Sequence, residues 1–400
     1  MRKVAVLFFL LGFTLSGYYA TWQIQLLNRG YSISQLALLL TIANIVAISI
    51  DVPTSALADK IGHKIAVMMG ICIYALGFLM PSLSSHPSAL AATVIMIAIG
   101  DGLIEGALES WTADIKSASG KDLINTKHFM GLDQSQRIGM IFGAFAVPGL
   151  ISALGVSTTG AWLPYCMLSA GTAVFTMRMS PGTVLSVKAE SNNSMPVTPS
   201  YLKLLTSMQS STLLILFLAS FAFGVSDGAV QLGFWPRMKQ VGLSDVALLG
   251  IIQASMSLAR LISLEGWKRF RIGISLYILP LSLFGASLFS ILFCAVESKY
   301  ALAGIWLLRI AMLAPFFAAQ RSYIQTLQRS SGWRATVASA VSTSSTIGCI
   351  SFTALGGIGI FNSSIQILYV GAGFSALSAF LFWKSINRFY HAQTPMKLGS

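Results

Sequence analysis

Apolar residues along this chain gather into long runs that short polar intervals separate. The runs do not alternate with a period of two, so they predict helices and not the strands of a barrel. Each run has about the 20 residues that a helix needs to cross the hydrocarbon core of a bilayer. Twelve membrane helices are predicted, at residues 4–26, 34–57, 65–83, 88–114, 135–154, 159–179, 208–231, 245–264, 274–294, 301–321, 335–360 and 363–385. The pattern therefore predicts an all-α polytopic membrane protein.

The longest polar interval falls midway along the chain, between the sixth and seventh predicted helices. A short repeat also relates the two halves. Gly30-Tyr-Ser-Ile-Ser-Gln-Leu-Ala opens the second predicted helix, and Gly242-Leu-Ser-Asp-Val-Ala opens the eighth, 212 residues later. We therefore expect two six-helix halves at residues 1–180 and 208–385, a cytoplasmic linker at 181–207 and a cytoplasmic tail at 386–400.

Composition agrees with a membrane environment. The chain is 55% apolar and 10% charged, with a mean hydropathy of +0.74, whereas soluble domains carry about 25% charged residues. The net charge of +13 is attributed to the Lys/Arg bias of cytoplasmic loops, not to a nucleic-acid partner. This bias predicts that both termini are cytoplasmic, and we expect a monomer in the inner (plasma) membrane of a prokaryote. The four cysteines show no metal spacing, and no metal or cofactor is expected.

Three motifs carry a family resemblance. The turn at 51–64 is similar to the loop signature G-x-L-A-D-R-x-G-R-K of the major facilitator superfamily, with Leu57, Ala58, Asp59, Gly62 and Lys64 matching it. The stretch 106–114, Gly-Ala-Leu-Glu-Ser-Trp-Thr-Ala-Asp, resembles the fourth helix of bacterial drug-efflux-like members, and Arg334-Ala-Thr-Val resembles the opening of their eleventh helix. The resemblance implies a secondary transporter that alternates access by rocking two six-helix halves.

The resemblance also implies a cytoplasmic gate around this turn. We interpret the turn as a latch whose basic residues face the end of the fourth predicted helix. His63 stands where the signature has arginine, which would make the latch sensitive to pH near neutrality. The predicted gate residues are Asp51, Asp59, Gly62, Lys64, Asp114, Arg137 and Arg334.

Three acids lie four residues apart on the fourth predicted helix: Asp101, Glu105 and Glu109. This spacing places them in one stripe along the helix. An acid at the centre of a bilayer costs at least about 2.5 kcal/mol, so the stripe is expected to face water, a partner charge or a substrate. Proton coupling is one interpretation. For Glu109 and Asp114, ion pairs with the basic residues of the cytoplasmic loops are the alternative.

The resemblance implies that the first, fourth, seventh and tenth helices line a central cavity. Asp227 and Arg309 are the charged candidates on the seventh and tenth. The expected partner of Arg309 is Asp227 or an acid of the fourth helix, and the alternatives are an anionic substrate or a salt bridge within one half. On the first helix the substrate-cavity candidates are Tyr18, Tyr19, Trp22 and Gln23, for which a place in the aromatic belt is the other interpretation.

An enzyme is not expected. Gly100-Asp101 is similar to part of the Gly-x-Gly-Asp motif of intramembrane aspartyl proteases, but residue 98 is Ala and no Tyr-Asp partner is found. No ATP-binding loop is found either. The expected function is proton-coupled efflux (antiport) of a small organic solute. The alternatives are a proton symporter that imports a metabolite, siderophore or other metal-chelate, and a sensor or assembly partner that transports nothing.

Overall fold

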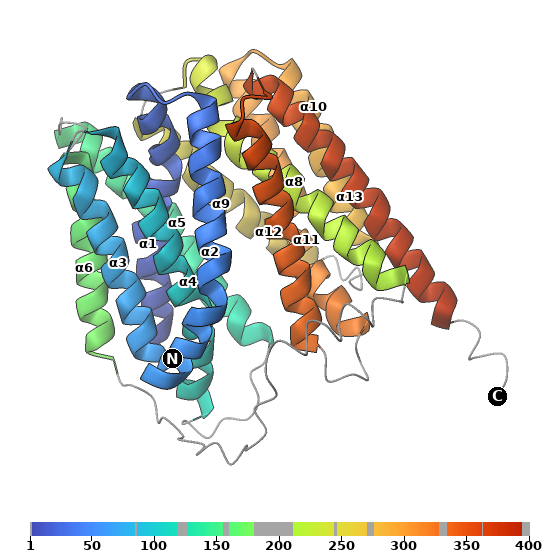
Figure 1. Ribbon diagram of the computed structural model, residues 1–400, viewed down its shortest axis with the longest axis horizontal. Coiled ribbons are helices and arrows are strands. Elements are labelled where there is room, and N and C mark those ends of the chain that lie inside the picture. The colour runs from blue at the N-terminus through green and yellow to red at the C-terminus, as the bar shows by residue number, and fades with distance from the viewer. Residues whose placement is uncertain are drawn as a thin grey trace. The chain divides into compact units, whose positions relative to one another are not determined.

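The structure is a computed structural model that describes residues 2–84, 86–117, 126–154, 160–179, 211–243, 246–269, 276–327, 334–361 and 363–393. These residues form twelve α-helices and one short 3-10 helix, η1 (Figure 1). The all-helical fold and the number of helices predicted from the sequence are thereby confirmed. The helices are α1 (Arg2–Asn28), α2 (Ile33–Ile61), α3 (His63–Leu83), α4 (Pro87–Ser117), α5 (Thr126–Leu154), η1 (Gly160–Trp162), α6 (Leu163–Met177), α8 (Ser211–Gln240), α9 (Val246–Arg269), α10 (Ile278–Ala295), α11 (Lys299–Leu327), α12 (Arg334–Gly357) and α13 (Ser364–Gln393).

The burial pattern of α10 is that of a membrane helix. Its exposed face is apolar, with Leu281 54% and Phe284 62% exposed, while Ser282, Ser287 and Ser290 are buried. In water this arrangement would be unfavourable, but in hydrocarbon the apolar face meets lipid, and Ser287 and Ser290 donate hydrogen bonds to the carbonyl oxygens of Ala372 and Ala286. Within the described residues, eight helices are long and apolar enough to cross a membrane.

The turn between α2 and α3 is tighter than the sequence predicts. Helix α2 continues to Ile61 and α3 begins at His63, so Gly62 alone separates them. Gly62 has a φ of 97°, a left-handed value that glycine adopts without strain. Hydropathy placed the helix ends at 57 and 65 because it records where hydrocarbon ends, whereas polar residues can continue the helical hydrogen bonds beyond it. The same reasoning explains why α13 extends to Gln393.

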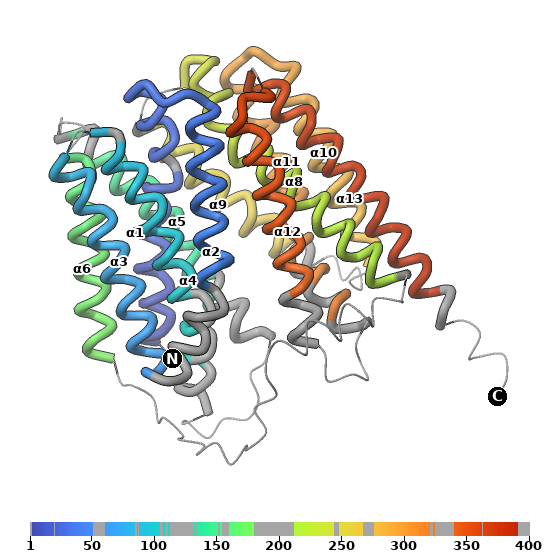
Figure 2. The backbone as a smooth tube through the Cα atoms, viewed as in Figure 1, coloured from blue at the N-terminus to red at the C-terminus, as the bar shows by residue number. Residues whose placement is uncertain are grey.

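The chain forms two compact units. Unit 1 contains α1 to α6 with residues 246–258 of α9, and unit 2 contains α8, the remainder of α9 and α10 to α13. In unit 1, α1 packs on α5, and α3 packs on α4 and α6; in unit 2, α8 packs on α12 and α13. Figure 2 traces the same helices as a backbone tube. The units depart from chain order at α9, and the division into two six-helix halves stays a prediction.

Glycines bring the backbones of equivalent helix pairs together in both units. In unit 1 a Cβ on Gly12 of α1 would meet the carbonyl oxygen of Gln136, and one on Gly139 of α5 would meet that of Phe9. In unit 2 a Cβ on Gly224 of α8 would meet the carbonyl oxygen of Ser345, and one on Gly348 of α12 would meet that of Phe221. Small residues at such points let membrane helices approach closely.

These contacts repeat at the offset found in the sequence. Gly12 and Gly224 are 212 residues apart, as are Phe9 and Phe221. The glycines that open the sequence repeat also share their backbone conformation, since Gly30 has a φ of 91° and Gly242 a φ of 82°. The two copies of the repeat therefore turn and pack in the same way.

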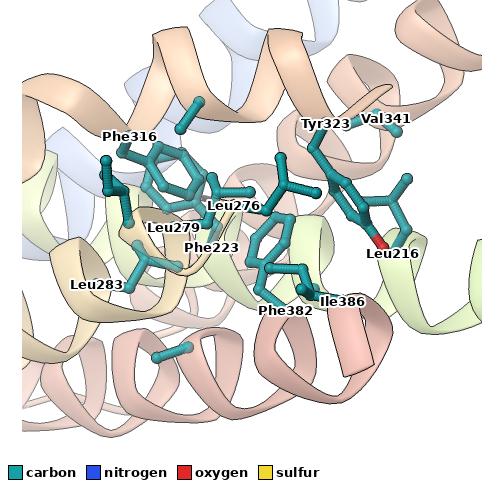
Figure 3. Packing of buried hydrophobic residues seen from close by; sticks show 14 of the residues in the cluster. Leu216, Phe223, Leu276, Leu279, Leu283, Phe316, Tyr323, Val341, Phe382 and Ile386 are labelled. Carbon is teal, nitrogen blue, oxygen red and sulfur yellow. The ribbon is translucent and has the colours of Figure 1, made fainter. Parts of the chain in front are cut away.

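The core of unit 2 is aromatic and aliphatic (Figure 3). The rings of Phe223 and Phe316 are 4.5 Å apart, and Phe382 meets Phe316 edge-on at 5.7 Å. The hydroxyl of buried Tyr323 is 2.8 Å from that of Ser385, so its polar end is satisfied within the core. This packing holds α8, α11 and α13 together.

Candidate functional site

Each unit holds a group of charged and polar side chains inside apolar helices. Such residues are costly in a membrane and mark functional positions more often than other residues do. The group in unit 1 is Tyr19, Tyr74 and Asp101, which we name the Asp101 cluster. The group in unit 2 is Asp227, Gln231, Arg260, Ser290, Trp306 and Arg309, which we name the Arg309 cluster.

Two phenols hold the carboxylate of Asp101. The hydroxyl of Tyr74 on α3 donates a hydrogen bond to Oδ1, and that of Tyr19 on α1 donates to Oδ2 at 3.4 Å. Asp101 itself is half-buried on α4. The site therefore joins three helices through a single carboxylate.

A glycine explains how Tyr74 reaches Asp101. A Cβ on Gly100 would lie 2.5 Å from the ring of Tyr74 and 3.0 Å from the carbonyl oxygen of Gly70. The absence of a side chain at Gly100 thus lets α3 and α4 approach and leaves room for the ring. The phenol then meets the next residue along α4, which is Asp101.

The other predicted cavity residues of α1 lie in the interior of unit 1. Tyr18 is 2% exposed, and its ring stacks on Trp22 at 6.1 Å. It also meets Phe78 edge-on at 5.5 Å and Trp162 at 6.1 Å. Trp22 and Gln23 are buried as well. Tyr19 donates a hydrogen bond to Asp101, an acid of the predicted stripe.

Arg309 and Asp227 are both placed within unit 2. Arg309 on α11 is 4% exposed, and its Nε donates a hydrogen bond to Ser290 Oγ on α10 at 2.7 Å. Asp227 on α8 accepts a hydrogen bond from Gln231 Nε2 at 2.8 Å. The Asp227 carboxylate interacts electrostatically with Arg309 and with Arg260 of α9.

Aromatic rings support the guanidinium of Arg309. Its central carbon lies 4.7 Å from the centre of the Trp306 ring, a cation–π distance. Trp306 in turn stacks on Phe234 at 4.1 Å and contacts Phe293 at 4.9 Å. The guanidinium therefore has an apolar ring on one side and a hydrogen bond at Nε, which together fix its plane.

Among the predicted gate residues, Lys64 has a well-defined contact. Its ammonium donates to the carbonyl oxygens of Met177 at 2.9 Å and Met179 at 2.6 Å. These carbonyls close the C-terminal end of α6, where a positive charge is favourable. The structure thus shows Lys64 as a cap on α6, and the latch role stays a prediction. Arg137 is half-buried on α5.

Six of the predicted site residues have side chains outside the described part of the structure. They are Asp51, Asp59, Glu105, Glu109, Asp114 and Arg334. The acid stripe is therefore represented here by Asp101.

The sequence interpretation missed five residues of the two clusters. Tyr74, Gln231 and Arg260 are polar positions inside apolar runs, a signal that was present and would have identified them. Ser290 and Trp306 gave no such signal, because serine is common in membrane helices and tryptophan is common at their ends.

Comparisons with known proteins were consistent with one another. The family profile described as Major Facilitator Superfamily matches residues 4–353. The crystal structure of the nucleoside transporter NupG is similar with a TM-score of 0.75 and 16% identity, covering 96% of this chain and 98% of that chain. The POT family transporter PepTSo has a TM-score of 0.69 and 13% identity, covering 98% and 99%. A peptide transporter POT in complex with sulfate has a TM-score of 0.71 and 14% identity, covering 97% and 94%. No functionally curated protein matches.

Proposed function

Because this chain belongs to the Major Facilitator Superfamily, it is a multi-pass membrane transporter of small molecules, and we propose that it couples transport to protons and exports an organic solute by antiport. We propose further that it is a monomer in a prokaryotic inner membrane. Its termini are proposed to be cytoplasmic, which the distribution of basic residues supports.

The observation that carries proton coupling is the carboxylate of Asp101. Two tyrosine hydroxyls hold it inside a membrane helix. A protonated carboxyl still accepts hydrogen bonds, so both phenols keep a partner when the proton arrives. Protonation then removes a charge that is costly in hydrocarbon while leaving the contacts between α1, α3 and α4 in place. Asp101 is thus suited to carry a proton through the transport cycle.

Asp227 is suited to a different role. It interacts with two guanidinium groups, those of Arg309 and Arg260. Protonation of Asp227 would leave the buried cation Arg309 without that counter-charge, which is strongly unfavourable. We therefore assign the proton to Asp101 and the charge balance of unit 2 to Asp227.

The direction of transport is supported by one stretch of sequence. Residues 106–114 resemble the fourth helix of drug-efflux-like members, which favours export. Import by symport is the second candidate, and the buried cation Arg309 favours it because a metabolite taken up by a cell is often an anion.

The test uses purified protein in liposomes with a pH-sensitive dye trapped inside. Solutes are added one at a time from a broad panel, and proton movement is compared between wild type, Asp101→Asn and the exposed control Glu297→Gln. We expect Asp101→Asn to lower solute-dependent proton flux more than about tenfold, with Glu297→Gln unchanged. Full proton flux in Asp101→Asn would remove Asp101 from the mechanism.

The direction of proton movement decides between the candidates. Protons that move against the solute indicate antiport, and protons that move with it indicate symport. A protein that responds to no solute of the panel would support the sensor interpretation instead.

A further inference from the structure

We propose that Arg309 binds a carboxylate of the transported solute, so that the substrates are organic monocarboxylates with an apolar or aromatic body. This inference rests on the proposed transport function and deepens it by naming the substrate class. It depends on residues of unit 2 alone.

The hydrogen bonds of the Arg309 guanidinium to the described residues are incomplete. Arg309 is 4% exposed, and the one hydrogen bond that it makes to the described part of the chain runs from Nε to Ser290. Its Nη1 and Nη2 atoms therefore have no protein acceptor within the described residues. Arginine cannot lose its charge, so these two groups are donors that an acceptor on a ligand can use.

The charges around Arg309 favour a ligand with a single negative charge. Two charged groups act on Arg309, the carboxylate of Asp227 and the guanidinium of Arg260, and their effects oppose each other. Asp227 makes no direct ion pair with Arg309 in the described part of the chain. The positive charge of Arg309 is thus offset in part, which leaves room for one negative charge. A monoanion fits this balance better than a dianion such as a phosphate monoester.

The contacts of the guanidinium leave one of its edges for a ligand. Ser290 holds one side of the guanidinium through Nε, and Trp306 lies against its face at 4.7 Å. The edge that carries both Nη atoms is the one left for a ligand. Two parallel N–H groups of a fixed guanidinium match the two oxygens of a carboxylate.

The aromatic residues next to the guanidinium favour a ligand with an apolar body. Trp306 stacks on Phe234 at 4.1 Å, and Phe293 lies 4.9 Å from Trp306. The indole Nε1 of Trp306 is buried without a hydrogen-bond partner, so a second donor lies in the same group of residues. An anion held beside this aromatic stack gains from an apolar body next to its charge. Small inorganic anions lack such a body.

The test measures binding in detergent at one pH and constant ionic strength, without any gradient. Thermal stabilisation is followed for three matched pairs of probes, acetate and acetamide, benzoate and benzamide, and nicotinate and nicotinamide. We expect wild type to be stabilised by benzoate or nicotinate and not by the corresponding amide. In Arg309→Gln the apparent affinity should fall about 100-fold, and the exposed control Arg388→Gln should bind like wild type.

Two further variants keep the test informative if Arg309→Gln is poorly folded. Asp227→Asn removes a negative charge near the site and should tighten carboxylate binding about tenfold. Ser290→Ala loosens the guanidinium and should weaken binding of the carboxylate without creating binding of the amide. The opposite directions of these changes are not expected from a general loss of stability.

The outcomes separate this inference from the proposed function. If no carboxylate stabilises the protein more than its amide, or if Arg309→Gln binds as tightly as wild type, the anion site is refuted. If carboxylates bind through Arg309 but no proton flux accompanies their transport, the proton-coupled function fails and the anion site stands. If a neutral solute drives proton flux, the proton-coupled function stands and the anion site fails.

Discussion

The approach of α8 to α12 supports a quantitative prediction about packing in unit 2. In Gly224→Ala the new methyl group would lie 2.6 Å from the carbonyl carbon of Ser345 and 2.9 Å from its Cα. Both atoms belong to the backbone, so a change of side-chain rotamer cannot relieve the contact. Carbon atoms pack best at about 3.5–4.0 Å, and the helices must therefore separate by roughly 1 Å.

The cost follows from that separation. A gap of about 0.5–1 Å forfeits a quarter to a half of the dispersion energy across the interface, and overpacking of this kind costs about 1–3 kcal/mol. Gly373 on α13 provides the control, because a Cβ there meets nothing within 4 Å. Gly373→Ala should gain about 0.5–1 kcal/mol from backbone propensity alone. The two variants should thus differ by about 1.5–4 kcal/mol in the free energy of unfolding.

The measurement is thermal unfolding of the purified protein in detergent, followed by tryptophan fluorescence. A difference of this size corresponds to an unfolding temperature about 2–5 °C lower for Gly224→Ala than for Gly373→Ala. Gly12→Ala should reproduce the effect in unit 1, since its methyl group meets the backbone of Gln136. If Gly224→Ala is as stable as Gly373→Ala, the close approach of α8 and α12 is wrong.

Three further predictions concern polar contacts, and each uses the same unfolding assay. Tyr74→Phe removes a hydrogen bond to the Asp101 carboxylate and should destabilise the protein by about 1.5–3 kcal/mol, with Tyr369→Phe unchanged. Lys64→Met removes the cap on α6 and should cost about 0.3–1 kcal/mol, less at high salt, and a loss equal to that of Lys384→Met would refute the cap. Arg237→Met removes the donor to the carbonyls of Cys294 and Val296 at the end of α10, which should cost about 1–3 kcal/mol, whereas an unchanged unfolding temperature would contradict this.

Much of the fold follows from local properties of the chain. The length of each apolar run sets the number of helices, because one run of about 20 residues is what a bilayer requires. Gly30 and Gly242, at the start of the repeat, both adopt positive φ, so the two copies of the repeat begin with the same backbone conformation. Helix ends were less predictable, as at Gly62, since hydropathy changes at the membrane surface and helical hydrogen bonding does not.

The candidate site was likewise predictable only in part from the sequence. The sequence identified Asp101, Asp227 and Arg309 because any charge in an apolar run stands out. It could not say which helix each side chain faces. A membrane helix is apolar on nearly all sides, so no periodicity marks its buried face, and the rotation of the helix about its axis is left open.

The sequence by itself thus determined the class of protein, the count of its helices and the charged residues that require an explanation. The tertiary structure decided the partners: Tyr74 and Tyr19 for Asp101, the α6 carbonyls for Lys64, and Ser290 and Trp306 for Arg309. Several of these partners lie on helices far apart in the chain, and their contacts depend on backbone approaches that glycines such as Gly100 permit. Such approaches are properties of pairs of helices, and the local pattern along one helix does not encode them.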